Sequence, residues 1–536
     1  MSARLIAACA LLAAPTVGHA ADPADALAAT IDRMLAADWG SRGIKPAAQA
    51  DDAEFVRRVY LDVIGRAPKA AETRDFLDDK TADKRAKLVE KLLSMPAHAN
   101  HFAAVTRNTW LPQAATNIQF ANPGFQIEQW LARHYRANTP ADVVVTKLLT
   151  VKLGQAVQGG NNMRFVQGDA SDPESFQLIG YYQANEARPE NVAAAVSRTF
   201  LGVKLECAQC HDHPFAAYTR EQFWEFAAFF SELNRVPGNR PGLVGPTQPQ
   251  SNLNRLTIPN TDRQVVATFF DGTDPKWTND RTPREELAAW MTSPANPFFG
   301  RNLANRMWAH FFGYGILDPV DEPGENNLPT HPELLDAIGK AFADGKYDNR
   351  MLIRAITRTK AYQLTSKMTH PTQADGRRFA RMNLKALTPP QLFDSLVAVT
   401  GFREAQGNRN AFSQFQANAA NPRGLFLNRF ASNEKLTEAN TTILQALMLM
   451  NGDFVANQTG LEKSEVLAAI ADAPFWTTKQ RVEAVFVTTF ARTPTADESE
   501  RFASYVERGG PTGDKKQALA DVFWVLLNST EFLFNH

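Results

Sequence analysis

Beyond residue 20 the chain has two cysteines, which stand together in the sequence Cys207-Ala208-Gln209-Cys210-His211. The spacing C-x-x-C-H is the attachment signal for c-type haem, in which two thiols add to the haem vinyl groups and the adjacent imidazole binds the iron from one face. We therefore predict haem c as the cofactor. Cys207 and Cys210 would be the thioether anchors, and His211 the proximal ligand of the haem iron.

Three other chemistries remain open for this motif. Cys207 and Cys210, with His211 or His213, could supply sulfur and nitrogen ligands to zinc or iron, although such ligands would be crowded. A redox dithiol is less favoured, because thioredoxin-like motifs belong to a βαβ context and the preceding residues predict a helix. A plain disulfide would suit an oxidising compartment and would need no cofactor.

The sixth ligand of such a haem is not obvious from the sequence. His213 lies too close to His211 along the chain to reach the opposite face of the haem, and there is no methionine between Met163 and Met291. An open sixth position would favour small-ligand binding or catalysis over simple electron transfer. The candidates, each more often a packed or surface residue than a ligand, are Met163, His98, His101, His134, His310 and His331.

A second cluster of polar residues lies among glycines and prolines between residues 305 and 336. Asp321, Glu325 and His331 would suffice for general acid-base chemistry on a glycan or ester, and Trp308 and Tyr314 could stack on a sugar ring. The polar residues of this run are Asn305, Arg306, His310, Asp318, Asp321, Glu322, Glu325, Asn326, Asn327 and His331.

A purely structural interpretation of this cluster is favoured. In that interpretation Arg306 pairs with Asp321 to fasten a long loop, and Thr330 with Glu333 caps the next helix. Arg306, Asp321 and His331 remain the candidate pocket residues of the alternative function, an envelope hydrolase or glycan-binding protein. The chain has no G-x-S-x-G elbow, phosphate-binding glycine loop, H-E-x-x-H helix or dinucleotide fingerprint, so the sequence assigns no enzyme class.

The elements around these residues are predicted to be mainly helical. Val192, Val196, Phe200 and Val203 fall on one face of a helix that would deliver the Cys-x-x-Cys-His motif from an apolar surface. Capping boxes, a threonine followed three places later by Glu or Gln, predict helix starts at Thr219, Thr282, Thr330, Thr388 and Thr495. The exception is a Pro/Gly-rich stretch, where residues 264–270 predict a short β element ending in the turn Asp271-Gly272.

One pattern, R-x-P-x3-E-x3-F, occurs twice. In each copy an apolar helical run leads into the arginine, and Pro and Glu then suit the opening of a second helix. Each copy therefore predicts a helix-turn-helix hairpin, to which we assign no chemical role. The two copies are Arg66, Pro68, Glu72 and Phe76, and Arg492, Pro494, Glu498 and Phe502.

Composition and the N-terminus bound the class of protein. Hydrophobic residues make up 44% and charged residues 21% of the 536 residues, a soluble globular balance that excludes wholesale disorder. Basic and acidic residues number 57 each, and no basic patch predicts a nucleic-acid partner. Arg4, the apolar stretch 5–14 and the small-residue end at Ala20 are typical of a secretory signal. We expect cleavage near Ala20, a periplasmic or otherwise exported protein, and no transmembrane segment in the mature chain.

Several stretches are similar to a known family. Residues 55–68, 199–203 and 207–215 resemble the planctomycete cytochrome C domain family, a family of unknown function. The second half resembles its usual companion domain, also of unknown function. The motifs that carry this second resemblance are Asn296-Pro297, Asn305-Arg306-Met307-Trp308, Phe312-Gly313-Tyr314-Gly315, the run from His331 to Asp336, and Asn440-Thr441-Thr442 leading into Leu447 and Asn451-Gly452.

The predicted organisation follows from these features. We expect a mainly α, multi-helical two-domain protein with a small β-containing linker insertion. The segments are a signal peptide (1–20), a polar and helical lead-in (21–49), a cytochrome C-like helical domain (50–235), a linker (236–281) and a helical companion domain (282–536). Larger relatives often carry a separate small cytochrome domain before this point, and this sequence has none before residue 50. The resemblance therefore implies that an electron partner would be another redox protein.

Overall fold

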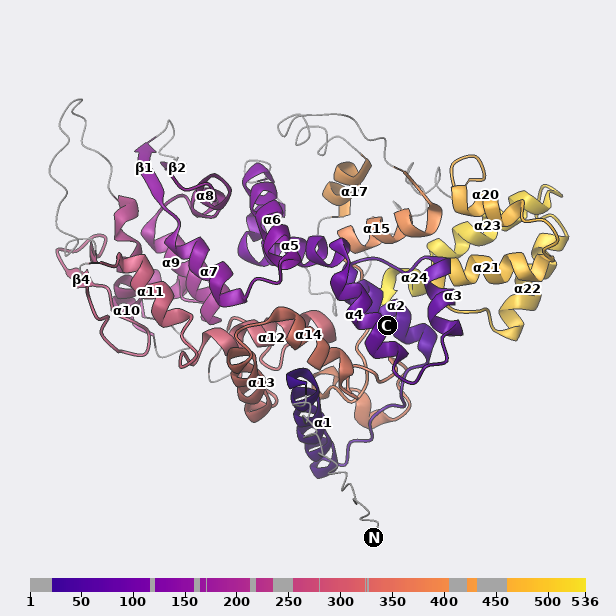
Figure 1. Ribbon diagram of the computed structural model, residues 1–536, viewed down its shortest axis with the longest axis horizontal. Helices are drawn as coiled ribbons and strands as arrows, with labels where there is room; N and C mark the ends of the chain where they lie inside the picture. Colours follow the sequence, from indigo (N-terminus) through magenta and orange to yellow (C-terminus); the bar gives the residue numbers. More distant parts are fainter. Residues whose placement is uncertain are drawn as a thin grey trace, which may run out of the picture.

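The computed structural model describes residues 22–115, 121–158, 164–169, 171–212, 218–234, 254–278, 280–322, 324, 327–403, 422–430 and 460–536. The predicted mainly α fold is confirmed. Figure 1 shows the helices spread along the long axis, with α7 to α11 at one end, α20 to α23 at the other, and α2, α12 and α14 between them.

The named elements of the described chain up to residue 150 are all helical. Pro23 and Pro96 occupy the first helical position, where a missing N–H costs nothing. α5 and α6 lie side by side along much of their length. The elements are α1 (Pro23–Ser41), α2 (Asp52–Ile64), α3 (Ala70–Asp78), α4 (Lys84–Ser94), α5 (Pro96–Trp110), η1 (Pro112–Ala115), α6 (Ala121–Arg136) and α7 (Ala141–Thr150).

The next part contains two small hairpins and the helices around the cysteine motif. Antiparallel strands β1 (Leu153–Gln158) and β2 (Arg164–Gly168) form one hairpin, and β3 (Arg255–Thr257) and β4 (Gln264–Val266) form the other. The β element predicted in the linker is thus present, although its strand is shorter than residues 264–270. The helical elements are α8 (Ser175–Ala184), α9 (Pro189–Val196), η4 (Ser197–Leu201), η5 (Glu206–Gln209), α10 (Arg220–Ala227) and η6 (Ala228–Asn234).

The remaining elements complete the centre and the far end of the molecule. The last strand pairs with a strand far earlier in the chain, Lys385 opposite Asn535 and Ala386 opposite Phe534. The elements are α11 (Pro283–Met291), α12 (Phe299–Phe312), α13 (Pro332–Asp344), α14 (Asn349–Arg358), η8 (Pro371–Gln373), η9 (Gly376–Arg378), β5 (Lys385–Ala386), α15 (Pro389–Thr400), α17 (Pro422–Phe430), α20 (Glu465–Ala471), α21 (Thr478–Phe490), α22 (Ala496–Glu507), α23 (Lys515–Leu527), α24 (Thr530–Leu533) and β6 (Phe534–Asn535).

Four of the five predicted capping boxes are confirmed, at Thr219, Thr282, Thr388 and Thr495. The box predicted at Thr330 is wrong. α13 begins one residue later, with His331 as its N-cap and no capping hydrogen bond from that side chain. The Thr330 hydroxyl instead donates to the carbonyl oxygen of Ile316 at 3.2 Å, so it fastens the loop before the helix.

The repeated pattern forms two similar helical hairpins, α2–α3 and α21–α22, as predicted. In the first, the Arg66 guanidinium donates two hydrogen bonds of 2.8 Å to Glu72. In the second, Arg492 makes the same two bonds to Glu498 at 2.8 and 3.0 Å. α21 also packs against α3, so the two hairpins contact each other although more than 400 residues separate them.

The hydrophobic core falls into two clusters. The first runs from Ala24 to Met382 and includes Ala491. The second comprises Leu61, Ala67 and residues between Leu387 and Phe532. The predicted domain boundary at residue 282 therefore lies inside the first cluster, because α11 packs against α7 and α12 against η4.

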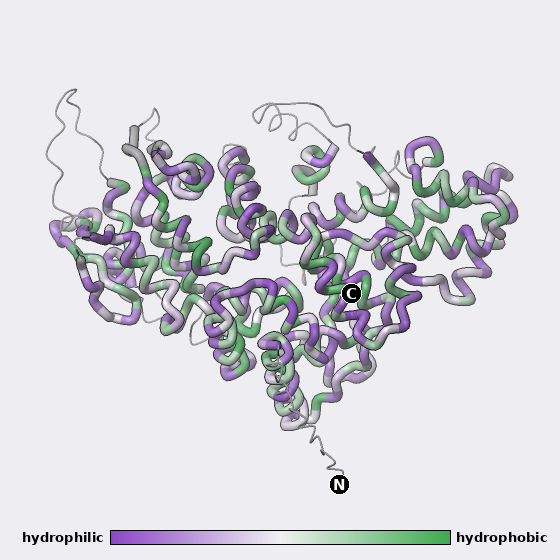
Figure 2. The backbone as a smooth tube through the Cα atoms, in the orientation of Figure 1, coloured by the Kyte–Doolittle hydropathy of each residue, from purple (hydrophilic) through white to green (hydrophobic). Residues whose placement is uncertain are grey.

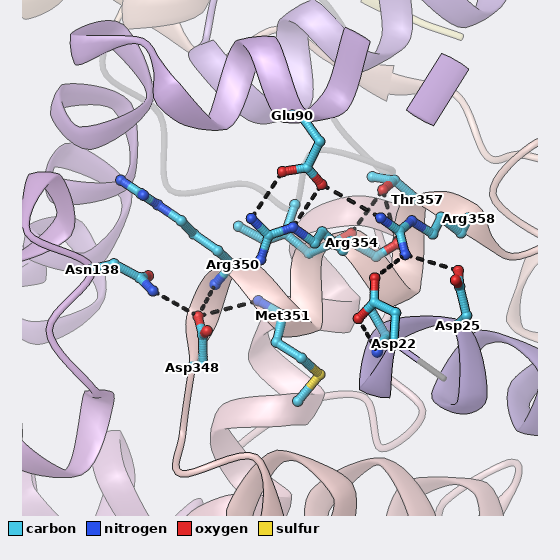
Figure 3. Close-up of polar contacts among 12 residues, drawn as sticks. Asp22, Asp25, Glu90, Asn138, Asp348, Arg350, Met351, Arg354, Thr357 and Arg358 are labelled. Carbon is cyan, nitrogen blue, oxygen red and sulfur yellow. Dashed lines mark hydrogen bonds and ion pairs between the residues drawn. The ribbon is translucent and has the colours of Figure 1, made fainter. Parts of the chain in front are cut away.

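Helix α14 ties together segments from the first third of the chain, as Figure 3 shows. The Arg354 guanidinium pairs with Glu90 of α4 at 2.6 Å. Arg358, at the end of the same helix, pairs with Asp22 and Asp25 at the start of α1, at 2.6 and 2.8 Å. These ion pairs bind α1 and α4 to one helix of the second half of the chain.

Figure 2 shows that hydrophobic and hydrophilic residues alternate within individual helices, as expected for helices with one buried face. Of the helices described, none combines the length and the apolar character that a bilayer crossing requires.

Candidate functional site

The Cys-x-x-Cys-His motif lies on a short exposed turn. Cys207 falls within the 3-10 helix η5 and Cys210 directly follows it, and both are free, exposed cysteines. Ala208 between them is fully buried and anchors the turn to the core. Both thiols are therefore accessible to a reagent.

The turn is delivered as the sequence predicted. Val192, Val196, Phe200 and Val203 are all buried. The helix ends at Leu201, and Gly202 follows with φ of +70°, a left-handed conformation that glycine adopts without strain. A Cβ at Gly202 would lie 2.7 Å from Oδ1 of Asn302, so this position also needs glycine because α12 approaches closely.

Helix α10 holds the turn from the other side. The indole nitrogen of Trp224 donates to the carbonyl oxygen of Gln209 at 3.1 Å. The backbone N–H of Arg220 donates to Oδ1 of Asp212 at 2.8 Å. These bonds fix the backbone of the motif and leave the Cys207 and Cys210 side chains free.

His211 is exposed, and its Nδ1 lies 2.7 Å from the carbonyl oxygen of Asp212. A carbonyl oxygen only accepts hydrogen bonds, so Nδ1 carries the proton in this arrangement. The lone pair then resides on Nε2. A backbone carbonyl on the other ring nitrogen is the usual support of a metal-ligating histidine. The chemistry of the donor set, two accessible thiols and one oriented imidazole, fits covalent haem.

Among the described residues, no group of three or more His, Cys, Asp or Glu side chains is placed to hold a metal ion. His213, the further ligand considered for zinc or iron, lies outside the described residues, as does Met163.

Three of the histidines considered as sixth ligands have contacts elsewhere, and a fourth, His101, is buried. His98 Nδ1 lies 3.1 Å from the carbonyl oxygen of Val63, and His310 Nε2 lies 2.9 Å from that of Asp62. His134 Nδ1 contacts the Thr139 hydroxyl at 3.0 Å. His101 is buried against Gly65. Burial lowers the pKa of His98 to about 4 and lowers that of His101 and His310, so all three are neutral packed residues.

Both ring nitrogens of His331 have contacts with neighbouring side chains. Its Nε2 lies 3.2 Å from Oδ2 of Asp38 on α1, and its Nδ1 lies 3.0 Å from the Thr330 hydroxyl. Burial lowers the pKa of His331 despite the nearby carboxylate.

The second candidate cluster is divided by the fold. Arg306 pairs with Asp321 at 3.5 Å, as the structural interpretation predicted, whereas His331 faces α1. The amide of Asn305 donates to the carbonyl oxygen of Leu317 at 2.8 Å and fastens the loop. Glu325 and Asn326 lie outside the described residues. The three residues Arg306, Asp321 and His331 thus do not meet as one acid-base set.

Arg306 and Asp321 instead border the segment that carries the cysteines. Nη2 of Arg306 donates to the carbonyl oxygen of Arg198 at 2.8 Å. Lys204 pairs with Glu322, the neighbour of Asp321, at 2.6 Å. The two candidate regions, about 100 residues apart in sequence, are therefore adjacent in the fold. Sequence reasoning treated them as separate sites, since nothing local indicates this contact.

Sequence reasoning also missed the β1–β2 hairpin. Its signal was present in the sequence, where Gly159, Gly160, Asn161 and Asn162 are of the residue types that favour turns and separate two short runs with β-branched and aromatic members.

The fold and the site together define a mainly helical protein with an exposed Cys-x-x-Cys-His turn. Two protein-family models match successive parts of the chain. Residues 30–235 match the family model PSCyt2, protein of unknown function (DUF1549), and residues 283–435 and 412–506 match PSD1, protein of unknown function (DUF1553). The chain thus contains both of these domains of unknown function, in this order. Neither a curated protein nor a solved structure matches it. The motif segment 440–452, used in the resemblance, lies outside the described residues.

Proposed function

We propose that the chain is an exported c-type cytochrome-like protein. Cys207 and Cys210 hold one haem covalently, and His211 supplies the proximal ligand. The observation that carries the proposal is the turn itself: two free, exposed thiols three residues apart, followed by an imidazole whose Nδ1 contacts a backbone carbonyl at 2.7 Å. When bound, haem supplies an iron centre for electron transfer or for binding a small ligand.

The attachment chemistry uses only groups of this turn. Each thiol adds across one vinyl group, so that sulfur bonds to one carbon and the thiol proton goes to the other. Both Cys207 and Cys210 are exposed, which allows the addition without opening the core. The buried Ala208 and the bond from Trp224 to Gln209 keep the backbone of the turn in place during the addition.

The exposed position of the motif favours exchange of electrons with a separate redox protein. A partner protein can directly approach a haem that is attached at an exposed turn. The described histidines considered as sixth ligands are bonded or buried elsewhere, which supports an open sixth position and hence small-ligand binding.

The test is an absorption spectrum and an intact mass of the protein, produced in a host with working c-type haem maturation. We expect a reduced α-band at the c-type position and one added haem mass. Both are expected to be lost in the Cys207→Ala/Cys210→Ala variant. His370→Ala, which removes a histidine outside the motif, is the matched control and should keep both signals.

An unmodified mass with no Soret band would contradict the proposal and favour the alternative, an envelope hydrolase or glycan-binding protein with a structural motif. Metal analysis and thiol titration of the same sample would then separate a zinc or iron site from a disulfide. Sequencing the N-terminus of the protein from the exported fraction tests the signal peptide, with cleavage expected after Ala20 or Ala21.

A further inference from the structure

A partly enclosed cavity of about 120 Å³ lies among α5, α6, α7, η4 and α12. Its walls are mostly apolar and include Phe102, Trp110, Val145, Phe200 and Met307. The cavity is somewhat smaller than an engineered cavity of roughly 150 Å³ that binds benzene, and its open side leaves room for a substituent on a ring of that size.

Two polar side chains of this cavity have unused donors. The Arg306 side chain lines the cavity, and its Nε is buried with no hydrogen-bond partner. Thr199, which also lines the cavity, has a buried hydroxyl without a partner. Buried donors without partners are costly, so a native structure that keeps two of them around one cavity indicates a ligand with acceptor atoms.

The charge of the cavity is positive. Arg306 is the charged side chain among the residues that line it, and no carboxylate belongs to that lining. His134 and His310 also line the cavity, and burial lowers the pKa of both, so they are neutral at pH 7. Asp321 compensates Arg306 from 3.5 Å and is itself partly exposed. Burial outweighs this compensation, because the pKa of Arg306 is lowered.

We propose that this cavity binds a small aromatic carboxylate of benzoate size. The ring would occupy the apolar part between Phe102, Trp110 and Phe200, and the carboxylate would accept hydrogen bonds from Arg306 and Thr199. The two oxygens of one carboxylate can accept from a guanidinium and a hydroxyl donor together. The inference is independent of haem, because it uses neither cysteine nor His211.

The cavity is also connected to the cysteine turn. Arg306 donates to the backbone of Arg198, whose side chain lies 3.6 Å from Glu206, the residue before Cys207. The ligand site and the proposed cofactor site therefore share the segment from Arg198 to Cys207.

Calorimetric titration of the full-length protein with benzoate tests the proposal, and benzyl alcohol serves as the uncharged ligand of similar shape. We expect benzoate to bind about 10- to 100-fold more tightly than benzyl alcohol, as a charged hydrogen-bonded partner requires. Thr199→Val should weaken benzoate binding about 10-fold without loss of fold, since its hydroxyl has no internal partner to lose.

Arg306→Met should abolish the preference for benzoate over benzyl alcohol. If this variant fails to fold, Ala141→Leu, which fills the cavity without touching a charge, should abolish binding of both ligands. Three outcomes would overturn the proposal: no heat of binding with benzoate up to about 10 mM, equal affinity for the two ligands, or benzoate binding unchanged in Thr199→Val and Ala141→Leu.

Discussion

Lys385 and Asp62 form a buried ion pair at the junction of the two core clusters. Nζ of Lys385 lies 2.6 Å from Oδ1 of Asp62, and the two side chains are 5% and 1% exposed. Asp62 also accepts hydrogen bonds from Tyr362 at 2.8 Å and from Asn535 at 2.7 Å. The Asp62 carboxylate thus links α2 to β5 and β6, which lie far from α2 in the sequence.

We predict that Lys385→Met destabilises the protein by about 3–5 kcal/mol, because it leaves the Asp62 carboxylate buried and unpaired. Denaturant unfolding at neutral pH measures the change. Asp62→Asn in the same chain should recover part of the loss, since it removes the uncompensated charge.

Lys340→Met is the matched control for this substitution. Lys340 pairs with Asp344 at the same distance of 2.6 Å, but both side chains are exposed. This variant should stay within about 0.5 kcal/mol of the unmodified protein. Equal losses of stability in Lys385→Met and Lys340→Met would show that the buried pair contributes no more than the exposed one.

We expect the same arginine substitution to lower stability by unequal amounts in the two hairpins. Arg66 pairs with one carboxylate, whereas Arg492 pairs with two, Glu498 and also Glu531 at 2.6 Å. Arg492→Met should therefore cost about 1 kcal/mol more than Arg66→Met in denaturant unfolding. Arg403→Met, which breaks an exposed pair with Glu465, is the control and should cost little. A larger loss at Arg66 would contradict the prediction.

Gly202→Ala should destabilise the helix end that delivers the cysteine turn. The left-handed conformation alone costs an alanine about 1 kcal/mol. The approach of Asn302, which donates from Nδ2 to the carbonyl oxygen of Thr199 at 2.8 Å, should add about 1–3 kcal/mol of packing strain. Gly43→Ala is the control that carries the backbone cost alone, because Gly43 has φ of +64° and open space around it. The loss of stability measured by thermal unfolding should be larger for Gly202→Ala than for Gly43→Ala by the packing strain of about 1–3 kcal/mol. Equal losses in melting temperature would argue against the close approach.

Acid should destabilise the protein through its buried histidines. Burial lowers the pKa of His98 from 6.5 to about 4 in the folded state. The unfolded state therefore binds the proton first as the pH falls, and stability present above pH 6.5 is lost between 6.5 and 4. For His98 alone the loss between about pH 7.5 and 5 is about 2 kcal/mol. Denaturant unfolding of His98→Gln at both pH values should show a pH dependence smaller by this amount, and an unchanged dependence would assign the effect to other groups.

Much of the local structure follows from the sequence because its causes are local. Threonine capping boxes, apolar residues at helical spacing and the R-x-P-x3-E-x3-F pattern each act within a few residues, so helix starts and both hairpins are predictable. Thr330 shows the limit of this reasoning. Its hydroxyl bonds to Ile316, a partner fourteen residues away, and that contact replaces the expected cap.

The candidate site divides in the same way. The sequence alone determined the Cys-x-x-Cys-His motif, the helix before it and the family, since spacing and residue type define all three. Only the tertiary structure decided that Arg306 meets the backbone of Arg198 while His331 faces Asp38. Those pairings depend on how α12 and α13 pack against η4 and α1, and packing partners are set by long-range burial of apolar faces, which no local pattern specifies.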